Sequence, residues 1–363
     1  MAQADVSLLS SVASQFQLAG HDFTVQAFGT GHIHDTFLVR GNGSRYLLQR
    51  INHAVYKDVA GLMQNIRRVT DHLQQKLDTS VPNSLTTFRV ISTHDQRWFY
   101  QDEAGHYWRM FTFVDHTVAY EVAQSPELIR KAGQAFGQFI TLLRDLPDEL
   151  ATTIPAFHDM GSRLRNFEGA VSEDTVGRLA QVSPEVAFVQ QRADEMRALH
   201  QRVADGEIPQ RTTHNDTKLS NILFDERSGE ARCVVDLDTV MPGTVLYDFG
   251  DAIRSMASTA AEDEADLDQV QFHFSSYEAF AEGFLSETRS FLTEAEVAQL
   301  PFSARYMTFI MGLRFLTDYL AGDVYYKIHD PEQNLRRARN QFQLIRRMED
   351  QYDEMFRTVQ RLV

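Results

Sequence analysis

The first third of the chain alternates between apolar and polar residues, which is the pattern of half-buried β-strands. Between the third and fourth of these segments, Leu62, Ile66, Val69 and Leu73 recur at helical spacing, so one helix is expected over residues 59–77. The expected strands cover residues 23–28, 36–40, 45–50, 88–92, 98–101 and 106–114.

The rest of the chain reads as mostly helical, with two short strands at residues 222–224 and 232–236. The expected helices cover residues 128–144, 184–203, 277–285, 294–300, 304–321 and 331–359. We therefore predict an α+β fold of two lobes. A small β-rich N-terminal lobe with one main helix comprises residues 1–113, and a large helical C-terminal lobe comprises residues 114–363, with a hinge near residues 113–117.

The composition of the chain argues against several classes of partner and function. The chain has 363 residues, 43% of them hydrophobic and 23% charged, as in an ordinary globular protein. Its formal net charge of −15 disfavours nucleic acids and anionic membranes as partners. The single cysteine, Cys233, allows no internal disulfide and reads as a buried structural thiol. With no signal-peptide pattern or long apolar run, a cytoplasmic location is expected.

The segment THNDTKLSNIL at residues 213–223 carries the most specific chemistry. It places Asp216, Lys218 and Asn221 just before a strand, and Asp236 ends the next strand. Phosphoryl transfer needs a carboxylate to accept the proton of the attacking hydroxyl, oxygen ligands for Mg²⁺, and a cation at the γ-phosphoryl group. The alternative is a set of polar residues that cap turns.

This segment, with DLDTVMPG at residues 236–243 and YDFGD at 247–251, resembles the aminoglycoside phosphotransferase and choline kinase superfamily of small-molecule kinases. GTGHI at residues 29–33, LLQ at 47–49 and RFLTDYL at 314–320 extend the resemblance to the bacterial N-acetylhexosamine 1-kinases within it. The resemblance covers nearly the whole chain and implies a bilobal protein-kinase-like fold. It makes the N-terminal lobe nucleotide-binding and the C-terminal lobe catalytic and substrate-binding, with ATP and Mg²⁺ as cofactors.

The resemblance implies a role for each residue that matches a motif of the family. Asp216 is implied as the catalytic base that also meets the acceptor, and Lys218 as a catalytic contact of the γ-phosphate of ATP. Asn221 and Asp236 are implied as the Mg²⁺ ligands. Asp248, in the YDFGD run, is implied to brace the catalytic loop.

In the small lobe, Gly29 and Gly31 are implied to let the backbone approach the triphosphate, although ordinary hairpin glycines look the same. Most family members carry a lysine on the third strand for the α- and β-phosphates. Here Gln49 and Arg50 stand there, and the following helix has no glutamate to pair with a lysine. Gln49 is the expected nucleotide contact, with Arg50 or Mg²⁺ and backbone amides as alternatives.

The resemblance also implies sugar-facing positions at His32, Arg314 and Tyr325. Each has an ordinary alternative: His32 as a turn cap, Tyr325 in packing, and Arg314 in an i,i+4 helix pair with Asp318. Asp238 stays open between a secondary ion or substrate role and a structural hydrogen bond.

The expected function is therefore ATP- and Mg²⁺-dependent phosphorylation of the anomeric hydroxyl of N-acetylglucosamine or N-acetylgalactosamine, with the sugar and ATP as partners. A kinase for another small alcohol or sugar is the alternative in the same class, and a silent nucleotide- or sugar-binding pseudokinase is the alternative outside it. A metallohydrolase built on His32, His34 and His214 is a third reading, although the sequence offers no further nearby His/Asp cluster.

Overall fold

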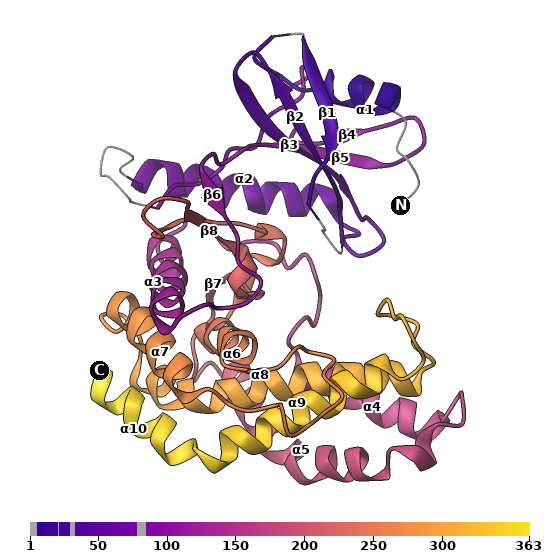
Figure 1. Ribbon diagram of the computed structural model, residues 1–363, viewed down its shortest axis with the longest axis vertical. Helices are drawn as coiled ribbons and strands as arrows, with labels where there is room; N and C mark the ends of the chain where they lie inside the picture. Colours follow the sequence, from indigo (N-terminus) through magenta and orange to yellow (C-terminus); the bar gives the residue numbers. More distant parts are fainter. Residues whose placement is uncertain (1–5, 21, 30–32, 78–84) are drawn as a thin grey trace. The chain divides into compact units, whose positions relative to one another are not determined.

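The structure, a computed structural model, describes residues 6–20, 22–29, 33–77 and 85–363 (Figure 1). The chain forms two compact units. The first comprises Met1–Val118, Leu142–Ile154 and Leu223–Met241, and the second comprises Ala119–Thr141, Pro155–Ile222 and Pro242–Val363. Two later segments thus return to the first unit. The expected boundary between residues 113 and 114 stays a prediction.

The first unit contains an antiparallel sheet whose strands lie in the order β1-β2-β3-β5-β4. Alternation creates its buried face: in β3, Tyr46 and Leu48 are buried and point to the same side of the sheet. The register sets Gln49 of β3 opposite Arg109 of β5. The strands are β1 (Phe23–Ala27), β2 (Asp35–Gly41), β3 (Ser44–Ile51), β4 (Tyr100–Gln101) and β5 (Tyr107–Thr112).

Two helices belong to this unit. Helix α1 (Val6–Ala13) packs on the sheet and contributes to the hydrophobic core. Helix α2 (Val59–Lys76) begins at Asp58, whose side chain accepts a hydrogen bond from the Gly61 amide at 2.9 Å. The strand expected over residues 88–92 is wrong, because only an isolated bridge from Val90 to Phe111 forms there. The core residues are Leu9, Val12, Ala13, Phe16, Phe37, Val39, Tyr46, Leu48, Trp108 and Met110.

The last segment of the first unit adds strands to a small sheet of order β6-β8-β9, in which β6 comes from the end of the first segment. Its strands are β6 (Thr117–Val118), β8 (Ile222–Asp225) and β9 (Ala231–Val234). Strand β9 leads to Asp236 and then to a single 3-10 turn, η3 (Leu237–Thr239). The strand expected over residues 232–236 therefore ends earlier, at Val234, so Asp236 follows the strand and precedes η3, while Asp238 lies within this turn.

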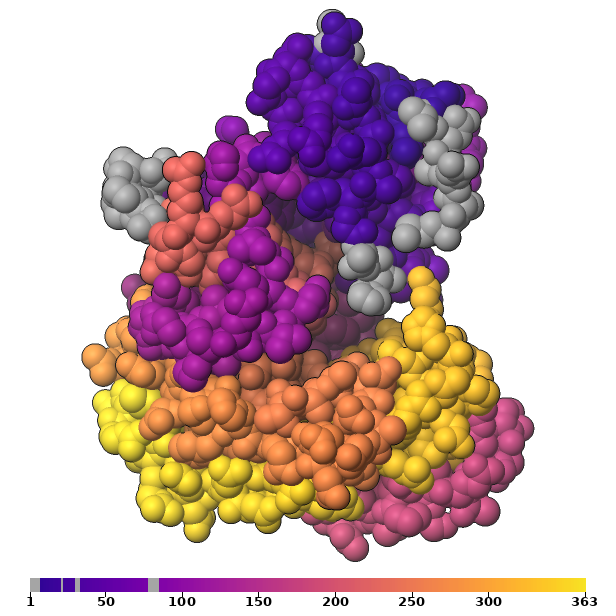
Figure 2. Space-filling model, viewed as in Figure 1, coloured from indigo at the N-terminus to yellow at the C-terminus, as the bar shows by residue number. Residues whose placement is uncertain are grey.

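The second unit is mainly helical. The long helix α8 packs against α6 and α9, and the C-terminal helices (yellow) lie beside the segment of α4 and α5 (pink) on the face shown in Figure 2. Its helices are α3 (Pro126–Leu143), α4 (Met160–Glu173), α5 (Ser183–Ala204), α6 (Val245–Met256), α7 (Phe274–Thr288), α8 (Glu294–Leu320), α9 (Gln333–Asp350) and α10 (Tyr352–Leu362).

Two helix predictions in this unit need correction. The segments expected as separate helices over residues 294–300 and 304–321 form one helix, α8, with Pro301 inside it. The segment expected as one helix over residues 331–359 is divided at Gln351 into α9 and α10. The α+β class is nevertheless confirmed, with a small sheet and one main helix in the first unit and helices in the second. No helix in the described part of the chain combines the length and apolarity needed to cross a membrane.

Candidate active site

The predicted catalytic loop follows strand β7 (Arg211–Thr213) in the second unit and ends in a short 3-10 turn, η2 (Leu219–Asn221). Within this loop, two of the predicted site residues, Lys218 and Asn221, contact the carboxylate of the third, Asp216. Asp216 Oδ2 accepts hydrogen bonds from Lys218 Nζ at 3.0 Å and from Asn221 Nδ2 at 3.1 Å. Asn221 Nδ2 also donates to the Asp216 backbone carbonyl at 2.8 Å, so its amide oxygen faces away from these bonds.

Electrostatics keep the Asp216 carboxylate ionised. Burial raises the pKa of this group, but the Lys218 ammonium, His214 and the Asn221 amide together outweigh burial and lower it. The Asp216 side chain is still 30% exposed, and that of Lys218 43%. A negative, reachable carboxylate beside a cation is the arrangement that a hydroxyl acceptor and a phosphoryl group require.

Asp248, on helix α6, braces the predicted catalytic loop. Its carboxylate accepts hydrogen bonds from the backbone amides of His214 at 2.8 Å and Asn215 at 2.6 Å. Its own carbonyl accepts from Thr217 Oγ1 at 2.5 Å. Burial raises the Asp248 pKa to about 6, against the opposing effect of His214 and these amides. The group is therefore largely ionised at neutral pH, when the two amide bonds are strongest.

The loop is also held from two other sides. Gly243, in strand β10 (Met241–Gly243), approaches it so closely that a Cβ there would lie 2.3 Å from Thr213 Oγ1 and 2.6 Å from Asn215 Oδ1. His158 Nε2 donates to the Asn215 carbonyl at 3.0 Å. Asn215 itself has a positive φ of 64°. The strained backbone beside Asp216 is thus fixed by surrounding contacts.

Asp236 belongs to the first unit, where it has a left-handed backbone conformation, with φ 59° and ψ 55°. Two residues on, Asp238 is 2% exposed and is bound on both oxygens: Arg109 forms a two-pronged ion pair with it, and His34 Nε2 lies 2.6 Å from Oδ2. These contacts favour the structural role for Asp238. Burial raises its pKa, but Arg109 and His34 lower it far more.

Gln49 is held between two side chains of the same sheet. Its Oε1 accepts from Arg109 Nε at 2.9 Å, and its Nε2 donates to Thr36 Oγ1 at 3.1 Å. Arg50, the alternative nucleotide contact, pairs instead with Asp35. Of the predicted glycines, Gly29 has a positive φ of 71° and open space where a Cβ would stand. Gly31 and His32 lie outside the described residues.

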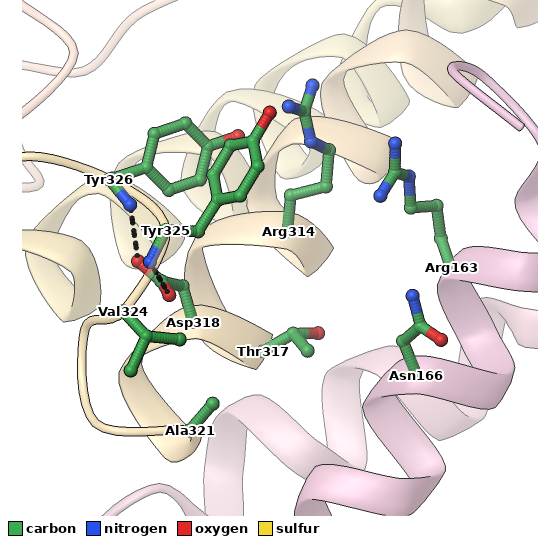
Figure 3. A pocket seen from close by; sticks show the side chains of 9 residues that line it. All are labelled: Arg163, Asn166, Arg314, Thr317, Asp318, Ala321, Val324, Tyr325 and Tyr326. Atoms are coloured by element: carbon green, nitrogen blue, oxygen red, sulfur yellow. Dashed lines mark hydrogen bonds between the residues drawn. The ribbon is translucent and has the colours of Figure 1, made fainter. Parts of the chain in front are cut away.

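Arg314 and Tyr325 line one pocket of the second unit (Figure 3). Arg314 stacks over the rings of Tyr325 at 5.7 Å and Tyr326 at 5.5 Å. It forms no ion pair with Asp318, whose carboxylate instead accepts from the backbone amides of Tyr325 and Tyr326 at 2.8 and 3.0 Å. The i,i+4 pair is therefore wrong, because Asp318 is used to hold the loop. The lining residues are Arg163, Asn166, Arg314, Thr317, Asp318, Ala321, Val324, Tyr325 and Tyr326.

Sequence reasoning missed Arg163, which projects from α4 into this pocket (Figure 3). Its Nη2 donates to the Phe157 carbonyl at 2.9 Å, and its buried Nε has no hydrogen-bond partner in the described structure. Burial, together with the charge of Arg314, lowers the Arg163 pKa. Two guanidinium groups thus share the pocket, and within the described part of the chain neither forms an ion pair with a carboxylate.

The residues implied for Mg²⁺ are chemically suited to it, since the Asn221 amide oxygen and the Asp236 carboxylate are hard oxygen donors. The described residues contain no cluster of three or more His, Cys, Asp or Glu side chains that would form a separate metal site. Of the histidines in the metallohydrolase reading, His34 contacts Asp238, and His214 packs between the rings of Phe136 and Phe139.

Comparisons with known proteins found a matching family and several similar structures. The model of the phosphotransferase enzyme family matches residues 24–283. A microcompartment-associated aminopropanol kinase has 16% identity and a TM-score of 0.67, over 97% of this chain and 99% of that one. Spectinomycin phosphotransferase in complex with ADP and spectinomycin has 10% identity and a TM-score of 0.57, over 99% and 100%. Plasmodium vivax ethanolamine kinase has 14% identity and a TM-score of 0.54, over 87% and 81%. These likenesses confirm the protein-kinase-like fold.

Proposed function

The chain belongs to the phosphotransferase enzyme family, and from this premise we propose that it transfers the γ-phosphoryl group of ATP to the anomeric hydroxyl of an N-acetylhexosamine, N-acetylglucosamine or N-acetylgalactosamine. The observation that carries the transfer chemistry is the Asp216 carboxylate, which Lys218 and Asn221 contact directly. The observation that bears on the acceptor is the pocket with paired guanidinium groups.

Asp216 accepts a hydrogen bond from the acceptor hydroxyl and orients its oxygen toward the γ-phosphorus. The new bond forms between that oxygen and phosphorus, the bond from phosphorus to the bridging oxygen of ADP breaks, and the hydroxyl proton passes to Asp216. The anomeric hydroxyl is more acidic than the other sugar hydroxyls, so a carboxylate of low pKa is a sufficient base.

Lys218, 3.0 Å from Asp216, supplies positive charge beside the attacking oxygen and meets the γ-phosphate. Asn221 and Asp236 would hold Mg²⁺, which neutralises charge on the phosphate oxygens. Gly29 and Gln49 stay proposed contacts of the nucleotide, together with Gly31. Positioning and charge neutralisation supply most of the rate enhancement in this scheme.

The pocket favours a neutral, hydroxyl-rich acceptor over an amine. Arg163 and Arg314 repel a cation, and the one carboxylate that lines the pocket, Asp318, already accepts hydrogen bonds on both oxygens. Guanidinium N–H groups and a tyrosine ring are the donors and the apolar wall that a pyranose uses. Arg314 and Tyr325 are accordingly proposed sugar contacts, and His32, outside the described residues, is proposed as a third on the resemblance alone.

An acceptor panel tests this proposal. ADP release is measured with ATP and Mg²⁺ and either N-acetylglucosamine, N-acetylgalactosamine, glucose, ethanolamine, 1-amino-2-propanol or choline, with the Asp216→Asn variant as the background. We expect acceptor-dependent ADP release with the N-acetylhexosamines and none with the amines. A preference for the amines would contradict the acceptor, and release equal to the Asp216→Asn background with every compound would favour a silent binding protein.

A further inference from the structure

The left-handed backbone conformation at Asp236 needs support from the surrounding structure. A left-handed conformation is unfavourable for residues other than glycine, although aspartate tolerates it better than most. Such a conformation persists when the surrounding structure fixes it. The turn η3 follows directly, so whatever holds Asp238 also holds the backbone at Asp236.

Asp238 is anchored through a buried network that starts in the sheet. Arg109 of β5 binds both carboxylate oxygens, with Nη2 to Oδ2 at 2.8 Å, and Gln49 accepts from Arg109 Nε at 2.9 Å. The Asn52 amide donates to His34 Nδ1 at 3.0 Å, so the His34 proton is on Nε2 and points at Asp238. The buried charges of Arg109 and Asp238, whose side chains are each 2% exposed, are therefore paired with each other.

A second link reaches the same turn from α2. Asn65, 1% exposed, donates from Nδ2 to the Val240 carbonyl at 3.2 Å and to the Ala151 carbonyl at 2.8 Å. Val240 in turn closes the 3-10 turn by donating to the Leu237 carbonyl at 3.1 Å. The turn is thus fixed at Asp238 by the sheet and at Val240 by the helix.

We infer that the Arg109–Asp238–His34 network is a positioning device that holds the Asp236 carboxylate in its metal-binding orientation. Arg109 is nearly fully buried, and its three nitrogens donate to Asp238 and Gln49, so it acts through the turn and is not a catalytic residue. The register places Arg109 opposite Gln49, the position where most family members carry a lysine. This inference rests on the proposed metal role of Asp236.

The test measures Mn²⁺ binding, by electron paramagnetic resonance in the presence of ADP, in variants of the full chain. Arg109→Lys keeps the charge but loses the planar fork that spans both Asp238 oxygens. We expect about tenfold weaker Mn²⁺ binding and an equal rise in the Mg²⁺ concentration for half-maximal activity, with kcat at saturating Mg²⁺ within about threefold of wild type. His34→Gln, which retains a donor for Asp238, should retain most of the affinity.

Arg192→Lys is the matched control, because Arg192 forms a two-pronged pair with Glu349 between α5 and α9, at 2.9 and 2.7 Å. It should leave Mn²⁺ affinity unchanged even if the melting temperature falls. Arg109→Met combined with Asp238→Leu removes both buried charges at once, so no charge is left unpaired. We expect this variant to melt cooperatively and still bind Mn²⁺ weakly.

The outcomes separate the two claims. Wild-type Mn²⁺ affinity in Arg109→Lys, or in a cooperatively melting double variant, would overturn the positioning role. Wild-type affinity in Asp236→Ala would instead show that the proposed metal site is wrong. Weak binding in Asp236→Ala together with normal binding in Arg109→Lys rejects the positioning role alone.

Discussion

Replacing Arg314 with lysine tests whether this side chain binds the acceptor in the proposed pocket. Within the described residues, the only hydrogen bond of the Arg314 side chain is a weak one from Nη1 to the Met311 sulfur at 3.4 Å. Its other N–H groups are therefore available to sugar hydroxyls, and its ring contacts are with Phe157, Tyr325 and Tyr326. Lysine keeps the positive charge but loses the planar fork of donors.

The magnitude follows from the bonds that lysine cannot remake. Loss of one hydrogen bond from a charged donor costs about 1.5–3 kcal/mol. At about 1.4 kcal/mol for each factor of ten, kcat/KM for the sugar should fall between about tenfold and about a hundredfold. The KM for ATP should change by less than about twofold, because Arg314 is proposed to contact only the acceptor.

Steady-state kinetics with each substrate varied in turn measures the two effects separately. Arg346→Lys is the control, since Arg346 also lies over an aromatic ring, Phe188 at 4.9 Å, but does not line the pocket. An unchanged sugar KM in Arg314→Lys, or an equal rise in both KM values, would refute the assignment of Arg314 to the acceptor.

Three further predictions concern the catalytic base, the helix packing and the pH dependence of stability. Asp216→Asn should lower kcat by about 10²–10⁴-fold while ATP affinity, followed by calorimetry, stays near wild type; near-normal kcat would contradict the base. Gly283→Ala should cost about 1–3 kcal/mol in urea unfolding, since its Cβ would lie 2.0 Å from a backbone oxygen of α3, whereas Gly169→Ala, in open space on α4, should gain about 0.5–1 kcal/mol. Burial lowers the His158 pKa to about 4, so the stability it contributes is present above pH 6.5 and is lost as the pH falls. Between pH 7 and pH 4.5, wild type should lose about 2–3 kcal/mol more than His158→Gln, and parallel losses would contradict this.

Local patterns explain what the sequence predicted well. Strands β1, β2 and β3 follow from alternation, which needs no knowledge of distant partners. The contacts among Asp216, Lys218 and Asn221 likewise follow from spacing within six residues of one loop. Helix α8 was expected as two helices, over residues 294–300 and 304–321, because proline ordinarily ends a helix. Here residues 300–310 are all buried, so packing against α6 and α9 holds the helix through Pro301.

Contacts between distant segments were beyond the reach of the sequence. Arg109 and Asp238 are 129 residues apart, and no local pattern marks their pairing. Arg163 was missed for a similar reason: helix α4 buries only Met160, Leu164 and Phe167, too few apolar positions for a clear helical period. The hydrogen-bond partners of Asp318 were also not predictable from its helical spacing to Arg314. Its carboxylate binds the backbone amides of Tyr325 and Tyr326, in the loop that follows α8.

The proposed reaction is phosphoryl transfer from ATP to a sugar anomeric hydroxyl, with Asp216 as the base. Phosphorus NMR of a reaction with ATP, Mg²⁺ and N-acetylglucosamine or N-acetylgalactosamine tests it most directly, with wild type and Asp216→Asn run side by side. We expect wild type to produce ADP and a sugar phosphate whose phosphorus couples to the anomeric proton, and Asp216→Asn to produce almost none. Phosphate on another hydroxyl, free inorganic phosphate alone, or equal product from both proteins would show that the proposed reaction is wrong.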